Sequence, residues 1–203
     1  AYACFNWLVM NIGLKQPFRI FCGTGNNGGD GLVTADYLLS QNADVIVYVV
    51  RYTKTSSPDF SENEKRILNK FAENIVNIYS RSDFPVLNED DVIIDALFGT
   101  GLNKVPQELS AETIQYINQK GGRIIAIDMP SGLMGDAPSN DHQETIIRAS
   151  DTLTFQLKKL SFYFPFSGSY CGNVHVMDIK LSEQFIASCK VNYYETEQED
   201  IQQ

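Results

Sequence analysis

Residues 18–31 read FRIFCGTGNNGGDG, a short apolar run followed at once by a segment rich in glycine. The run Phe18–Cys22 has the composition of a buried strand, and apolar residues recur at helical spacing between Leu32 and Leu39. The pattern G-x-G-x-x-G, which begins at Gly23, therefore stands between a strand and a helix. In that position the free amides of a helix N-terminus can face a phosphate.

The alternation of strand and helix continues along the chain. It predicts right-handed crossovers and an α/β fold, a Rossmann-like three-layer sandwich with a mostly parallel central sheet. Ser61 is expected to cap a charged helix, with Glu64 completing a capping box. Further strands are expected at 45–50, 75–79, 92–95, 124–127, 153–155 and 174–177, and further helices at 5–12 and 109–117.

Composition narrows the class of protein. The 203 residues suffice for one domain with a core, and no apolar run approaches the roughly 18 residues that a membrane helix needs. The formal net charge of −9 opposes a broad electrostatic grip on nucleic acid or anionic lipid, so neither partner is expected. The four cysteines form no CxxC pair and no signal peptide is recognisable, which predicts a soluble protein of the cytoplasm.

The glycine segment departs from the familiar nucleotide loops. A P-loop needs Lys and then Ser or Thr after its last glycine, but Leu32 and Val33 follow Gly31. An ordinary dinucleotide fold places an acid at the end of the second strand, where this chain has Arg51. NTP hydrolysis and standard hydride transfer are therefore disfavoured, and a glycine-rich turn without a ligand remains an alternative for the pattern alone.

Two further loops begin with an aspartate at the end of a strand. They read Asp95-Ala-Leu-Phe-Gly-Thr-Gly101 and Asp128-Met-Pro-Ser-Gly132. Each aspartate, taken alone, could be a capping or Asx-turn residue. Because the carboxyl ends of parallel strands share one edge of a sheet, the three loops are expected to converge on one crevice.

The segments GTGNNGGDG, IIDALFGTGL and AIDMPSGLMGD, followed by TFQLKKLSFYFP and GNVHVMDI, resemble the YjeF N-terminal domain family. The best-known activity of that family is NAD(P)H-hydrate epimerase. The resemblance implies an isomerase that converts the R and S forms of hydrated NADH or NADPH (NADHX and NADPHX) at C6 of the nicotinamide ring. It does not separate NADHX from NADPHX as the preferred substrate.

The resemblance also assigns site residues. It implies a potassium ion held by Asn27, Asp95 and Ser131, and their amide, carboxylate and hydroxyl oxygens are hard ligands suited to such a cation. The stretch from Leu102 to Val105 departs from many relatives, which have an arginine there. The implied substrate contacts are Asn26, Asn27, Gly28, Gly29, Asp30, Gly99, Thr100, Gly101, Leu102, Asn103, Lys104, Val105 and Asp128.

The configuration at C6 can change by loss and return of hydroxide or by ring opening, and either route requires a group that gives and takes a proton at one oxygen. We expect Asp128 to be that catalytic group, since it is the ionisable residue of the third loop that is not matched to the metal. Lys159 falls where the family has a lysine; it either helps to position the substrate or is a solvated or phosphate-contacting side chain.

Non-catalytic alternatives remain: a protein-interaction scaffold of the same fold, or a regulatory nucleotide-binding domain. Retention of Asn27, Asp95, Asp128 and Ser131 favours the enzyme. We expect residues 1–189 to form the epimerase domain and 190–203 a polar connector to a dehydratase domain of a longer, bifunctional protein. The resemblance also allows a homodimer.

Overall fold

The computed structural model describes residues 1–120, 122–136, 139 and 142–195. Within them seven strands form a single sheet in the order β3-β2-β1-β4-β5-β6-β7, and every neighbouring pair is parallel. The predicted α/β fold with a parallel sheet is confirmed, and each strand lies within two residues of its predicted limits. The strands are β1 (Phe18–Cys22), β2 (Val45–Val50), β3 (Ile75–Ile78), β4 (Val92–Ala96), β5 (Arg123–Ile127), β6 (Asp151–Phe155) and β7 (Asn173–Met177).

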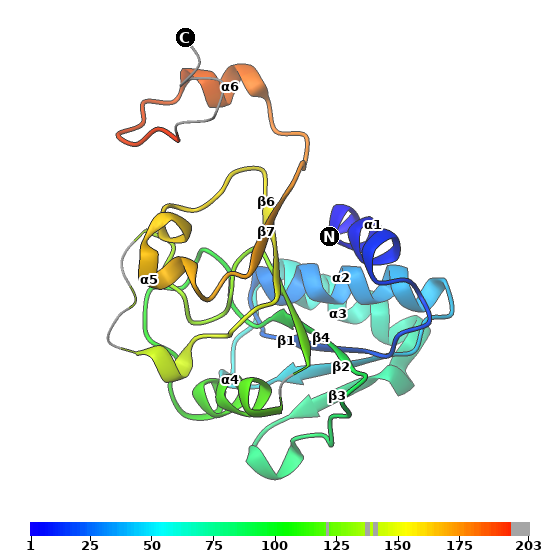
Figure 1. The fold of residues 1–203 in the computed structure, drawn as a ribbon. Helices are drawn as coiled ribbons and strands as arrows, with labels where there is room; N and C mark the ends of the chain where they lie inside the picture. The colour runs from blue at the N-terminus through cyan, green and yellow to red at the C-terminus, as the bar shows by residue number, and fades with distance from the viewer. Residues whose placement is uncertain (121, 137–138, 140–141, 196–203) are drawn as a thin grey trace.

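Helices cover both faces of the sheet, which gives three layers (Figure 1). Successive residues of β1 point to opposite faces. Ile20 packs in the apolar cluster of α1, α2 and α3, whereas Phe21 packs in the cluster of α4. Coverage on both faces explains why the central strands are almost continuously apolar. The α-helices are α1 (Tyr2–Asn11), α2 (Asn26–Ser40), α3 (Pro58–Phe71), α4 (Glu108–Lys120), α5 (Pro165–Gly168) and α6 (Glu183–Ser188), and the 3₁₀ turns are η1 (Ala72–Asn74), η2 (Arg81–Asp83), η3 (Gln143–Thr145) and η4 (Leu160–Tyr163).

None of the helices in the described part of the chain has both the length and the apolar character required to cross a bilayer.

The glycine-rich segment is largely helical and not a loop. Helix α2 begins at Asn26, and Gly25 is its N-cap with an extended backbone. Glycine has a low helix propensity, so the sequence pattern alone placed the start of this helix later. Packing against the sheet decides the outcome, because Gly28 and Gly31 lie where a side chain would meet Gly23 and Ala96.

The predicted start of α3 is wrong. Ser57 is the N-cap, and its hydroxyl accepts a hydrogen bond from the amide of Phe60 at 3.1 Å. Pro58 occupies the first turn, where its missing N–H costs nothing. Ser61 instead donates its hydroxyl to the Ser57 carbonyl, and Glu64 forms an ion pair with Arg51. The helix therefore begins one turn earlier than the capping-box pattern indicates.

The predicted polar tail, residues 190–203, lies outside the described residues from position 196 onward. Figure 1 shows α6, which precedes it, standing apart from the sheet. The carboxylate of Glu195 accepts hydrogen bonds from Lys158 at 2.6 Å and from the hydroxyl of Tyr163 at 2.5 Å. The domain boundary at residue 189 stays a prediction.

Candidate functional site

The site lies where the strand order reverses. Strands β1 and β4 are neighbours, with β2 and β3 on one side and β5, β6 and β7 on the other. The chain after β1, after β4 and after β5 meets at the carboxyl edge of the sheet, the usual place for a ligand in an open parallel sheet. The predicted convergence of three loops is confirmed.

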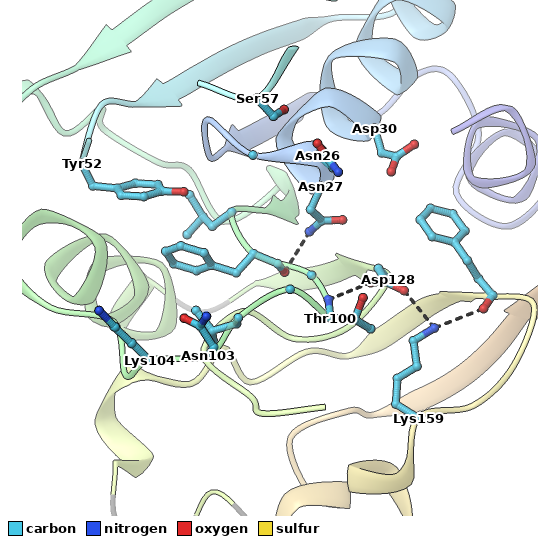
Figure 2. A pocket seen from close by; sticks show the side chains of 17 residues that line it. Asn26, Asn27, Asp30, Tyr52, Ser57, Thr100, Asn103, Lys104, Asp128 and Lys159 are labelled. Carbon is cyan, nitrogen blue, oxygen red and sulfur yellow. Dashed lines mark hydrogen bonds and ion pairs between the residues drawn. The ribbon is translucent and has the colours of Figure 1, made fainter. Parts of the chain in front are cut away.

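A cavity of about 790 Å³ opens at this edge, and Figure 2 shows the side chains that line it. Ten of the thirteen predicted substrate contacts line it. Gly28 and Gly29 do not, because they are buried in α2 against Gly23 and against the start of α3. Val105 also lies outside the lining. The walls are formed by Gly25, Asn26, Asn27, Asp30, Tyr52, Ser57, Leu97, Phe98, Gly99, Thr100, Gly101, Leu102, Asn103, Lys104, Asp128, Phe155 and Lys159.

Asn27 joins the first loop to the second. Its amide nitrogen donates to the backbone carbonyl of Phe98 at 2.9 Å. Its Oδ1 is buried and has no hydrogen-bond partner among the described residues. A buried amide oxygen without a donor is costly, so this atom is suited to a ligand or a cation.

Asp95 and Ser131 lie behind the cavity wall and are completely buried. The Ser131 hydroxyl donates to Oδ1 of Asp95 at 2.6 Å, and the Ser131 amide donates to Oδ2 at 2.8 Å. The Ser131 hydroxyl also accepts from the amide of Phe98 at 2.8 Å. Burial raises the pKa of Asp95 to about 6, against the lowering effect of these hydrogen bonds. The pair therefore ties the second loop to the third.

Of the three residues predicted to hold potassium, Asn27 and Ser131 contact the Phe98 backbone, and Asp95 is joined to them through Ser131. The Phe98 carbonyl accepts from Asn27 and lies 3.2 Å from the Ser131 hydroxyl. Within the described residues no three His, Cys, Asp or Glu side chains gather as a metal-binding group. The donors near Asn27 are amide, carbonyl, hydroxyl and carboxylate oxygens, the set that hard cations favour.

Asp128 stands at the end of β5 in a strained backbone conformation. Its φ is +68°, in the left-handed region that non-glycine residues seldom adopt, at a cost of about 1–3 kcal/mol. Its Oδ2 accepts from the amide of Thr100 at 3.0 Å, and its Oδ1 lies 3.0 Å from Nζ of Lys159. The strained backbone therefore supports a carboxylate held at both oxygens on the cavity wall (Figure 2).

Lys159 reaches the site from the segment after β6. Its ammonium also donates to the backbone carbonyls of Phe155 at 3.1 Å and Leu157 at 3.2 Å. Two carbonyls and one carboxylate use the three donors of the ammonium. Lys159 is thus a fixed cation beside Asp128, not a solvated surface lysine.

Asp30 adds a second carboxylate to the cavity, in the first turns of α2. Burial raises its pKa. The cavity wall therefore carries two carboxylates, on Asp30 and Asp128, and two ammonium groups, on Lys104 and Lys159.

Sequence reasoning missed several lining residues. The Tyr52 ring packs on the Phe98 ring with centroids 5.0 Å apart, and it belongs to the segment that follows β2. The carboxyl-edge argument that identified the loops after β1, β4 and β5 applies equally after β2 and could have found it. The same argument applies to Ser57 after β2, Phe98 after β4 and Phe155 at the end of β6. It does not say which side chains of a loop face the cavity, because that depends on the path of the loop.

Comparison with known proteins places the chain in a family. A family model described as YjeF-related protein N-terminus matches residues 1–161. The chain belongs to this family. Among YjeF-related proteins, it is 32% identical over 157 residues to a protein of Limosilactobacillus reuteri named NAD(P)H-hydrate epimerase, covering 77% of this chain and 70% of that protein.

Longer YjeF-related proteins also match. The chain is 37% identical over 156 residues to the "Bifunctional NAD(P)H-hydrate repair enzyme Nnr" of Thermofilum pendens, and 34% identical over 183 residues to the protein of that name from Moorella thermoacetica. These matches cover 75% and 88% of this chain but 29% and 34% of the relatives. The chain thus spans about a third of their length.

A crystal structure of the yeast protein ynu0 superposes on the chain with a TM-score of 0.75 and 17% identity, covering 96% of this chain and 84% of the yeast one. At that identity the likeness establishes the shared fold alone.

Proposed function

We propose that this domain is an isomerase that interconverts the R and S forms of NADHX and NADPHX at C6 of the nicotinamide ring. The observation that carries the proposal is the Asp128–Lys159 pair, a carboxylate and an ammonium 3.0 Å apart on one cavity wall. The proposal is supported by family membership and by relatives named NAD(P)H-hydrate epimerase.

The chemistry at C6 requires a base and an acid close together. In the ring-opening route, the Asp128 carboxylate takes the proton of the C6 hydroxyl while the C6–N1 bond breaks. The Lys159 ammonium turns one N–H from a backbone carbonyl to N1 and gives N1 that proton. An aldehyde forms, turns its other face to N1, and closes with both protons returned. No net proton is consumed, and each group ends as it began.

The surroundings prepare Asp128 for this role. The Thr100 amide and the Lys159 ammonium hold the carboxylate at both oxygens, so little reorientation is needed when the substrate binds. Residues of α2 supply the opposite wall, where the amides of the helix N-terminus suit the pyrophosphate of a dinucleotide.

Asn27, Asp95 and Ser131 would hold a potassium ion in this proposal. The partnerless Oδ1 of Asn27 supports the assignment, because it is a buried oxygen without a hydrogen-bond donor. The ion would supply positive charge that joins the three loops and stabilises the carboxylate of Asp95.

The rest of the protein is also a matter of proposal. Because the chain spans about a third of the bifunctional repair enzymes, we place it as the epimerase part of a longer cytoplasmic protein with a linked dehydratase domain. A full reading frame that stops at Gln203 would overturn this placement. A homodimer of the domain, tested by light scattering, belongs to the same proposal.

The test supplies one purified epimer of NADHX to the protein in potassium buffer and follows the appearance of the other by chromatography. The expected result is conversion well above the spontaneous rate. Conversion at the spontaneous rate would instead favour a domain that binds nucleotides or proteins without turnover.

A further inference from the structure

A second cavity adjoins the first on the far side of Tyr52. It measures about 490 Å³ and is formed chiefly by the segment that follows β2. Tyr52 lines both cavities, so the two share this residue. The lining residues are Arg51, Tyr52, Thr53, Lys54, Ser56 and Tyr79.

The charged residues of this lining are cationic, in a chain whose net charge is −9. Arg51 is already engaged: it forms an ion pair with Glu64, donates from Nε to Asn77 at 2.7 Å, and lies over the Phe60 ring. Lys54 is exposed and makes no ion pair within the described part of the chain. The second cavity thus offers one ammonium ready for an anion.

An aromatic side chain lines the same cavity as this ammonium. The side chain of Tyr79 is 68% exposed although it lines the cavity, and it follows directly on the end of β3. An exposed ring at a cavity wall is a platform on which a planar base can stack. The second cavity therefore combines a phosphate-binding charge with a base-binding face.

We propose that the second cavity binds the adenosine end of the dinucleotide, with Lys54 on a 2′-phosphate and Tyr79 against the adenine. This inference rests on the proposed function and adds a preference for NADPHX over NADHX. In doubly wound sheets the adenosine ribose lies at the end of the second strand, where a basic residue accommodates a 2′-phosphate. Here Arg51 is paired with Glu64 and Asn77, so Lys54 is the basic residue that contacts the 2′-phosphate.

The arrangement also orients the substrate. The nicotinamide lies at Asp128 and Lys159, the pyrophosphate lies at the start of α2, and the chain of the dinucleotide passes Tyr52 to reach the second cavity. The order along the carboxyl edge follows the strand order β5, β4, β1, β2.

The test measures binding of 2′-phospho-ADP-ribose and ADP-ribose by calorimetry, in the wild-type chain, Lys54→Ala and Lys15→Ala. Lys15 is an exposed lysine that lines neither cavity, and it precedes β1 at the opposite edge of the sheet. Lys54→Ala should weaken 2′-phospho-ADP-ribose about tenfold and ADP-ribose less than twofold, because only the first carries the phosphate. Lys15→Ala should change neither constant.

Tyr79 provides a second, independent readout. Tyr79→Ala should weaken both ligands about equally, and Tyr79→Phe should restore them, since stacking needs the ring and not the hydroxyl. Equal affinity of the wild-type chain for the two ligands, or loss of both in Lys54→Ala, would overturn the inference.

Failure of the inference and failure of the proposed function give different results. If the wild-type chain epimerises NADHX but Lys54→Ala changes the affinity for neither ligand, the adenosine site in the second cavity is wrong and the proposed epimerase activity is retained. Lys54-dependent binding of 2′-phospho-ADP-ribose without epimerisation would leave the cavity assigned and remove the epimerase.

Discussion

Nζ of Lys159 lies 3.0 Å from Oδ1 of Asp128, although the two residues come from different loops of the sheet's carboxyl edge. The ammonium of Lys159 also donates hydrogen bonds to the carbonyls of Phe155 and Leu157, so its position is fixed before substrate binds. A carboxylate whose partner is already in place requires little rearrangement to act as a base. This pair is the chemical centre of the account.

Replacing Lys159 should therefore impair turnover more than binding. Lys159→Met should lower kcat for epimerisation about a hundredfold, the scale on which a positioned polar group acts in a buried site. Lys158→Met is the matched control, because Lys158 pairs with Glu195 and does not line the cavity. Steady-state kinetics of both variants make the comparison; equal effects, or an effect on KM alone, would contradict the assignment.

Substituting two glycines of the same motif, Gly28 and Gly25, should change the free energy of unfolding by very different amounts. A Cβ on Gly28 would stand 1.8 Å from the Gly23 carbonyl oxygen, whereas a Cβ on Gly25 would meet nothing within 4 Å. Gly28→Ala should lower the free energy of unfolding by about 2 kcal/mol or more, because backbone must move to relieve the clash. Gly25→Ala should lower it by no more than about 1 kcal/mol, the cost of a poorer N-cap without a clash. Urea unfolding of the two variants decides, and similar losses would argue against the close packing of α2 on the end of β1.

Potassium should stabilise the fold through Asn27. At constant ionic strength, KCl in place of choline chloride should raise Tm by about 3 °C, since a ligand that binds only the folded state adds to its stability. Asn27→Ala should abolish that rise, because the partnerless oxygen is removed. Thermal unfolding in the two salts provides the measurement. An identical shift in both proteins would mean that potassium acts elsewhere.

Asp151 should make stability depend on pH at the other edge of the sheet. Burial opposes its ionisation, but hydrogen bonds from His175 and Arg123 outweigh it and lower its pKa below the ordinary 3.8. A carboxylate whose pKa is lower in the folded protein stabilises the fold at pH values above its pKa in the unfolded chain. This stabilisation is lost as the pH falls below that pKa.

Asp151→Asn should accordingly be less stable than wild type at pH 7, by about 1–3 kcal/mol, because Arg123 and His175 lose their partner. The difference should shrink as pH falls from 7 to below 3.8 and the wild-type carboxylate becomes protonated. Urea unfolding at several pH values provides the test. A difference that stays constant across that range would speak against a lowered pKa.

The sheet was largely predictable because parallel strands that are buried on both faces consist of continuous runs of apolar, mostly β-branched residues. Strand β2, VIVYVV, matches its predicted limits without error. Helix starts were harder to predict. Ser57 followed by Pro58 marks the start of α3, but the capping-box pattern of Ser61 and Glu64 led to a predicted start at Ser61. Helix α2 begins within glycines, where packing on β1 overrides helix propensity.

The candidate site was predictable where topology alone brings residues together. Asn27, Asp95 and Asp128 each follow or end a strand, so the shared carboxyl edge implied their proximity. The ion pair of Asp128 with Lys159 could not be predicted in this way, although Lys159 follows β6 at the same edge, because topology does not determine which side chains of two loops come into contact. The role inferred for Lys54 could not be predicted either, since the sequence does not show that Arg51 is already paired with Glu64.

The central claim is that Asp128 exchanges the proton at the C6 oxygen. Asp128→Asn keeps the size of the side chain, and the Thr100 amide can still donate to its oxygen, so the cavity should persist. The decisive measurement is the rate at which one purified NADHX epimer gives the other, with ADP-ribose affinity measured in parallel. The account predicts unchanged affinity and a rate lowered about 10²–10⁴-fold; unchanged affinity with an unchanged rate would contradict it.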